Sequence, residues 1–147
     1  MKLHFRVPMV LMSILLASCG SGPVKRVSPP TASVQELVVR ADGSWHLRVR
    51  LQNFSNVPMI FSGIDAELEV ADQMAGSIKL PFKLDIPGES ADVFEASLTP
   101  TANARVPAGD FAYRLHGTIS SSEPKGAFKF ERKSHLSPAP GLANTWR

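Results

Sequence analysis

Apolar and polar residues alternate in several short stretches of this chain. The clearest is WHLRVRLQN, in which apolar side chains from Trp45 to Leu51 lie at every second position. The same period of two recurs in DAELEV, ADVFEASL, FAYRLHG and GAFKFER. Because successive side chains of a strand point to opposite faces, this period is typical of half-buried β-strands.

The alternation also predicts which face of each strand is buried. A one-residue slip in register would exchange the two faces, so the prediction is specific. We expect these side chains to be buried: Leu47, Val49, Leu68, Val70, Phe111 and Tyr113. We expect these to be exposed: Arg48, Arg50, Glu67 and Glu69.

Turn-forming residues separate the alternating stretches. They lie at residues 41–44, 53–56, 87–88, 107–109 and 123–126, where Gly, Pro, Asn, Asp and Ser favour tight turns. No convincing amphipathic helix follows residue 18. Several short strands at regular spacing predict an all-β fold, an antiparallel sandwich or barrel.

Opposite charges follow two of the predicted strands. Arg48 and Arg50 lie on the outward face of one, and a carboxylate series from Asp65 to Glu69 lies on the outward face of another. If the two strands are neighbours, each facing pair contributes about 0.2 to 1 kcal/mol. The alternative is that both faces are simply solvated.

The N-terminal residues have the pattern of an export signal. Lys2 and Arg6 supply positive charge, and residues 7–17 form an apolar run that is shorter than the roughly 20 residues of a membrane span. Leu16-Ala17-Ser18-Cys19 resembles the lipobox of bacterial lipoproteins. That resemblance implies cleavage after residue 18 and acylation of Cys19. The alternatives for this cysteine are a free thiol, an interchain disulfide and a buried core residue.

The remaining chain divides into three expected parts. Residues 19–33 are rich in Gly, Ser and Pro and are expected to form a flexible tether from the acylated cysteine. Residues 34–136 form one β-domain, and residues 137–147 a Pro-rich tail in which Trp146 docks on the body, contacts a partner or hangs loose. Gly20 stands where aspartate would resemble an inner-membrane retention signal, so the expected location is the periplasmic face of the outer membrane.

Composition excludes several kinds of protein. Removal of residues 1–18 leaves 129 of the 147 residues, enough for one domain, with 14 of the 16 basic residues against 13 acidic ones. Nucleic-acid binding calls for a basic stripe, which this balance does not provide. With one cysteine in the chain, no intramolecular disulfide can form, and apolar packing must hold the fold.

Four segments resemble the late embryogenesis abundant type 2 (LEA type 2) family, also called the water stress and hypersensitive response (WHy) domain. They are HLRVRLQNFSNVPMIFSGIDAELEV, IKLPFKLDIPGES, FAYRLHGTI and GAFKFERKSHL. The family has an Asn-Pro-Asn-like turn, where this chain has Phe54 in place of proline, and a late Tyr-x-Leu-x-Gly strand. The resemblance implies a single β-sandwich of fibronectin type III-like architecture, an association with desiccation and stress tolerance, and no active site.

Catalytic and metal-binding patterns are missing from the sequence. His46, His116 and His135 are widely separated, and no His-x-x-x-His or multi-cysteine spacing occurs. Asp65, Glu67 and Glu69 alternate on an outward face, whereas a calcium site needs six to eight converging oxygens. We therefore expect no enzyme, no metal and no cofactor.

These observations predict a non-catalytic envelope lipoprotein with a stress-protective or accessory role. Its partners are expected to be membrane lipid, through acylated Cys19, and an envelope protein of unknown identity, with no nucleic acid. The domain is expected to fold as a monomer. The alternative is a protein–protein interaction module of an envelope complex, because sandwiches commonly bind through loops and exposed edges.

Overall fold

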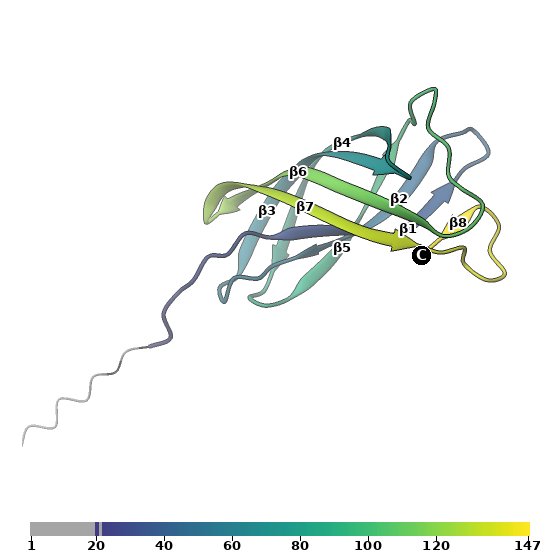
Figure 1. Cartoon of the computed structure of the whole chain (residues 1–147). Helices are drawn as coiled ribbons and strands as arrows, with labels where there is room; N and C mark the ends of the chain where they lie inside the picture. Colours follow the sequence, from purple (N-terminus) through teal and green to yellow (C-terminus); the bar gives the residue numbers. More distant parts are fainter. Residues whose placement is uncertain (1–19, 21) are drawn as a thin grey trace, which may run out of the picture.

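The computed structural model describes residue 20 and residues 22–147, so Cys19 and the expected leader lie outside the described residues. Eight strands and no helix occur in this described part (Figure 1). The strands are β1 (Thr31–Val39), β2 (Trp45–Gln52), β3 (Met59–Val70), β4 (Gln73–Ile86), β5 (Ala91–Leu98), β6 (Phe111–Glu123), β7 (Lys125–Leu136) and β8 (Thr145–Trp146).

The strands form two antiparallel four-stranded sheets. One has the order β5-β2-β1-β8 and the other the order β4-β3-β6-β7. Three hairpins lie within a sheet, β1–β2, β3–β4 and β6–β7, while the other connections cross between the sheets. The predicted single antiparallel β-sandwich, with its fibronectin type III-like architecture, is therefore confirmed.

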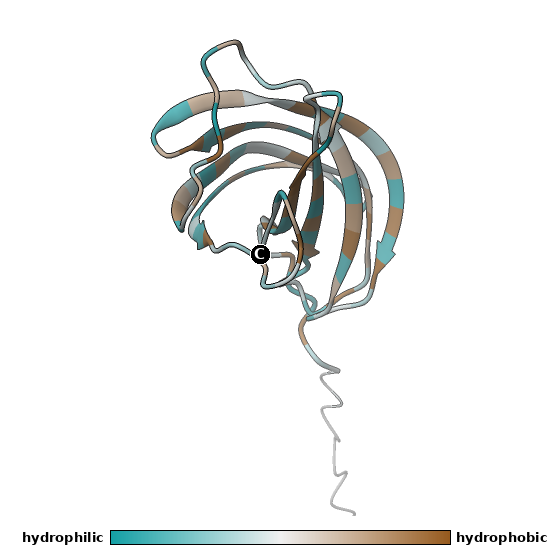
Figure 2. Ribbon diagram, turned by 90° about the vertical axis from the view of Figure 1, so that its right-hand side faces the viewer, coloured by the Kyte–Doolittle hydropathy of each residue, from teal (hydrophilic) through white to brown (hydrophobic). Residues whose placement is uncertain are grey.

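The core lies between the two sheets, where the alternating apolar side chains meet. Viewed from the end nearest the C-terminus, the ribbons change repeatedly between hydrophobic and hydrophilic along each strand (Figure 2). All six side chains predicted to be buried are buried, each at most 4% exposed. Arg48, Arg50 and Glu67 are exposed as predicted, but Glu69 is only partly exposed because it packs against Arg114.

The hypothesis that Arg48 and Arg50 face the carboxylates from Asp65 to Glu69 is wrong. These residues lie on β2 and β3, which belong to different sheets. Arg48 instead stands opposite Glu36 on β1 and Glu95 on β5. The carboxylates of β3 stand opposite Lys79 of β4 and opposite His116 and Arg114 of β6.

The β3–β4 hairpin has a turn that the residue pattern did not indicate. Ala71 and Asp72 occupy its two central positions with φ of 49° and 63°, the left-handed conformation that two-residue hairpins require. β4 is an edge strand, which is why Pro81, without an N–H to donate, is tolerated within it.

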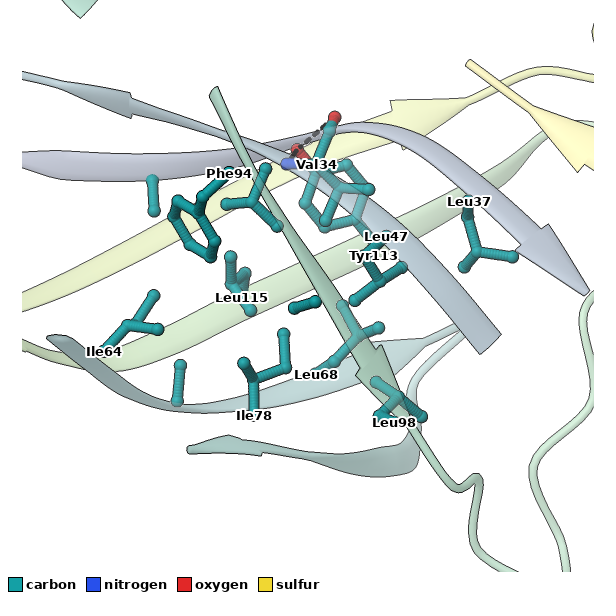
Figure 3. Close-up of a cluster of buried hydrophobic side chains, with 14 of the residues drawn as sticks. Val34, Leu37, Leu47, Ile64, Leu68, Ile78, Phe94, Leu98, Tyr113 and Leu115 are labelled. Carbon is teal, nitrogen blue, oxygen red and sulfur yellow. Dashed lines mark hydrogen bonds between the residues drawn. The ribbon is translucent and has the colours of Figure 1, made fainter. Parts of the chain in front are cut away.

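Two motif residues of the late strand have structural roles. The Tyr113 hydroxyl accepts a hydrogen bond from the Val34 N–H at 3.0 Å and donates one to the Val34 carbonyl at 3.4 Å (Figure 3). It thereby joins β6 of one sheet to β1 of the other. A Cβ on Gly117 would lie 2.2 Å from the Asp65 carbonyl oxygen, so only glycine permits β3 and β6 to approach this closely.

The sandwich has two ends with different loops. The tether end is the end at which residues 22–30 enter, together with the loops 53–58 and 87–90 and the β6–β7 turn at Pro124 (Figure 1). The far end holds residues 40–44, 71–72, 99–110 and 137–144. β1 begins at Thr31, inside the expected tether, and β8 lies inside the expected tail.

Candidate functional site

The three candidate histidines do not come together. His46 lies on β2 of one sheet, whereas His116 and His135 lie on β6 and β7 of the other. His46 contacts Glu95 at 3.6 Å, and His116 contacts Glu67 at 3.7 Å. No group of three potential metal ligands occurs among the residues that the structure describes.

The carboxylates of β3 belong to a charged ladder across the outer face of their sheet. Arg114 lies between Glu69, at 3.1 Å, and Glu131, at 2.9 Å, and Lys133 lies 3.2 Å from Glu131. The hydrogen bond from Arg114, and then that from Lys133, lowers the pKa of Glu131 to about 2. These four residues are paired with one another, and Glu69, Arg114 and Lys133 also line a hollow of about 450 Å³. The ladder therefore stabilises the outer face of the sheet.

The tether end is organised around the buried side chain of Asn53. Its amide nitrogen donates to the carbonyls of Val57, Ile86 and Pro87 at 3.0 to 3.1 Å, and its amide oxygen accepts from the Ser55 N–H at 2.9 Å. Asn53 is fully buried. One side chain therefore holds the loop after β2 against the end of β4.

The incoming chain is hydrogen bonded to this same loop. The Asn56 side chain donates to the Val24 carbonyl at 2.8 Å and accepts from the Arg26 N–H at 2.7 Å. The Ser28 N–H donates to Ser55 Oγ at 2.8 Å. Part of the expected tether is thus attached to the body before β1 begins.

Apolar side chains are exposed around this attachment. Val24, Val27 and Phe54 are among the six exposed large hydrophobic side chains of the described residues. Val27 also lines a mainly apolar hollow of about 630 Å³. Its other apolar lining residues are Val57, Pro58, Ile60 and Pro124. We call Val24, Val27 and Phe54, with this hollow, the tether-end apolar surface.

The predicted site residues have different outcomes. Cys19 lies outside the described residues, so its acylation stays a prediction. Trp146 docks on the body: as part of β8 it pairs with Leu37 of β1, and the centre of its ring lies 6.2 Å from that of Phe111. The tether-end apolar surface was missed, although the departure at Phe54 from the family's proline was a signal for it.

Comparisons with known proteins identify the fold and no family. No known protein family and no curated protein matches the sequence. The solution structure of AT1g01470 from Arabidopsis thaliana is similar, with a TM-score of 0.52 and 12% identity over 82% of this chain and 84% of that one. The crystal structure of a protein from Archaeoglobus fulgidus has a TM-score of 0.42 and 13% identity, covering 78% of this chain and 98% of that one.

A search for membrane-spanning helices in residues 22–147 finds none that has both the length and the apolar character of a span.

Proposed function

We propose that this chain is a non-catalytic envelope lipoprotein, anchored through acylated Cys19, whose LEA type 2-like sandwich protects the envelope during desiccation or osmotic stress. The observation that carries the proposal is the arrangement of the N-terminal segment. The lipobox-like Leu16-Ala17-Ser18-Cys19 is followed within a few residues by a chain that is hydrogen bonded to one end of a folded β-domain.

Further support comes from the character of the residues that resemble the family. Asn53, Tyr113 and Gly117 carry the likeness, and each is committed to hydrogen bonding or close packing inside the sandwich. The charged ladder is likewise internally paired. A domain whose distinctive residues build the fold suits a protective or accessory protein better than an enzyme.

The anchor is tested by Cys19→Ser in the full chain. Because one sulfur atom carries the lipid, we expect the variant to lose fatty-acid labelling and to leave the membrane fraction, while the wild type keeps both. A single acyl chain binds membranes only weakly, so the mass of the mature wild type should show more than one. A Cys19→Ser protein that is still labelled and still sediments with membranes would contradict the assignment.

The stress role is tested by comparing a deletion strain with its parent during drying and osmotic shock. We expect lower survival, restored by the wild-type gene and not by the Cys19→Ser gene. Unchanged survival of the deletion strain would refute the protective role and leave the anchor intact.

A second candidate is an interaction module that adds a strand to its sheets. It is favoured by the open sheet edges: β5 and β4 each have a hydrogen-bonded neighbour on one side only. Such edges can pair with an extended segment of another protein. Crosslinking on intact cells should then capture one reproducible partner through a photoreactive residue at Val93 of β5, and repeated absence of an adduct would exclude it.

A further inference from the structure

Hydrogen bonds between the incoming chain and the loop after β2 limit how far the tether end can lie from Cys19. Among the residues that the structure describes, Val24 is the first whose backbone bonds to the loop after β2, through Asn56. Val24 lies five residues after Cys19, and five residues of fully extended chain span at most about 18 Å. An anchor at Cys19 therefore holds the tether end, and not the far end, next to the bilayer.

Exposed apolar side chains are gathered at this end. Val24 is 82% exposed, Phe54 49% and Val27 47%. Asn56 and Ser55 fix the backbone beside them through the bonds to residues 24–28, so these side chains are presented from an ordered surface. Phe54 does not belong to the hydrophobic core or to the apolar side chains packed against it, so the packing of the sandwich does not require an apolar residue at its position.

Charges of both signs surround the surface. Lys25, Asp85 and Glu123 line the hollow, and Arg26 lies 4.0 Å from Glu89. Among the described residues, only two further basic ones, Arg50 and Arg132, lie beside Phe54, where they line a smaller hollow with it. Attraction to anionic headgroups needs a cluster of unpaired basic residues. The chemistry of this end therefore favours contact with the apolar boundary of the bilayer, with little dependence on lipid charge.

We infer that the tether-end apolar surface inserts into the lipid surface and fixes the orientation of the sandwich on the membrane. The inference rests on the proposed lipid anchor: the acyl chains supply attachment, and Val24, Val27 and Phe54 set which end faces the bilayer. The far end, with its long loop 99–110, then faces away from the lipid.

The test uses the full-length lipoprotein in phosphatidylcholine vesicles with one added cysteine. The chain has one cysteine, and acylation occupies it, so Phe54→Cys supplies the only free thiol for a nitroxide label. Leu142→Cys is the matched control, since Leu142 is 48% exposed at the far end and Phe54 49% exposed at the tether end. Accessibility of each label to oxygen and to a water-soluble nickel chelate reports its depth.

We expect the label at position 54 to lie about 5 to 10 Å below the lipid surface, at low and high salt alike, and the label at position 142 to remain in water. Labels that report water at both positions on vesicle-bound protein would overturn the inference and leave the anchor standing. Equal insertion of both labels would also overturn it. A mature protein whose mass shows an unmodified Cys19 would overturn the anchor and, with it, this orientation.

Discussion

The two ends of the sandwich are closed by different chemistry. At the tether end one buried amide, that of Asn53, makes four hydrogen bonds that join the loop after β2 to the end of β4. At the far end the closing group is apolar: the Trp146 ring packs near Phe111, and its indole nitrogen has no hydrogen-bond partner among the described residues.

This difference predicts how each end fails. When one member of a buried hydrogen-bond network is removed, several buried groups are left without partners, so a single substitution lowers the free energy of unfolding by a large amount. An apolar contact loses free energy in proportion to the atoms removed and to the cavity left behind. The tether end should thus be sensitive to single polar substitutions, whereas the far end should tolerate conservative apolar replacements.

Asn53→Ala is expected to have the largest effect. It leaves the Ile86 carbonyl and the Ser55 N–H, both in buried hydrogen bonds, without partners, and it frees two further carbonyls. We expect the free energy of unfolding to fall by about 4 kcal/mol, measured by urea denaturation. Asn103→Ala, at an exposed far-end position, should change it by less than about 0.5 kcal/mol. Similar losses from both substitutions would remove the contrast between the ends.

Trp146→Ala should cost somewhat less, about 3 kcal/mol, because it leaves a cavity beside Phe111 and releases β8 from β1. Trp146→Phe should recover most of this loss, since the indole N–H makes no bond that is given up. Chemical denaturation of both variants, with exposed Leu142→Ala as control, measures the difference. A Phe variant as unstable as the Ala variant would show that the far end also depends on a polar contact.

Tyr113→Phe tests a polar link between the sheets, away from either end. The Val34 N–H loses its partner, so unfolding should become easier by about 1 to 3 kcal/mol. Burial raises the pKa of Tyr113 above its ordinary value of 10.0, and the hydrogen bond with Val34 offsets this only in part.

The raised pKa also gives a pH dependence of known sign. Above pH 10 the unfolded chain releases the phenol proton first, so the stability contributed by Tyr113 is complete below pH 10 and is lost as the pH rises through the folded-state pKa. Since Tyr113 is the only tyrosine, tyrosinate absorbance of the folded protein measures it directly. Ionisation at or below pH 10 would contradict its burial.

Ala71→Gly should give the smallest effect, and in the opposite direction. Four non-glycine residues of the described part of the chain have a positive φ, and the far end holds three of them, Ala71, Asp72 and Asn144. Because the left-handed conformation is costly for residues with a Cβ, glycine at position 71 should stabilise the protein by up to about 1 kcal/mol. Ala108→Gly, in a loop without this conformation, should instead be slightly destabilising in the same thermal melts.

The sequence predicted the parts of the fold whose side chains alternate strictly. β2 has a period of two along its whole length, β5 has it over residues 93–98 and β6 over residues 111–115, and the buried faces of these stretches follow directly from it. β4 was missed by the alternation because its preceding turn, Ala71-Asp72, has no Gly, Pro or Asn, and because Pro81 interrupts it. Only the family resemblance included part of this strand.

Pairing between strands could not be derived from the pattern. Which strand lies beside β2 depends on how the chain crosses between the sheets. Outward charges on two strands do not determine these crossings. The expected pairing of Arg48 with the β3 carboxylates was wrong for this reason. The tether-end apolar surface was missed for a related reason. Whether Phe54 is buried or exposed depends on the geometry of the loop that Asn53 fixes through its bond to Ser55, and the residue pattern does not reveal this geometry.

The position of β1 has a mechanical consequence. β1 follows directly from the incoming chain and runs from the tether end to the far end, paired with β2 along nearly its whole length. A pull on the N-terminus away from the far end therefore acts along the strand axis. The hydrogen bonds between β1 and β2 are then loaded together in shear and do not break one after another. We therefore expect β1 to resist being pulled out of its sheet.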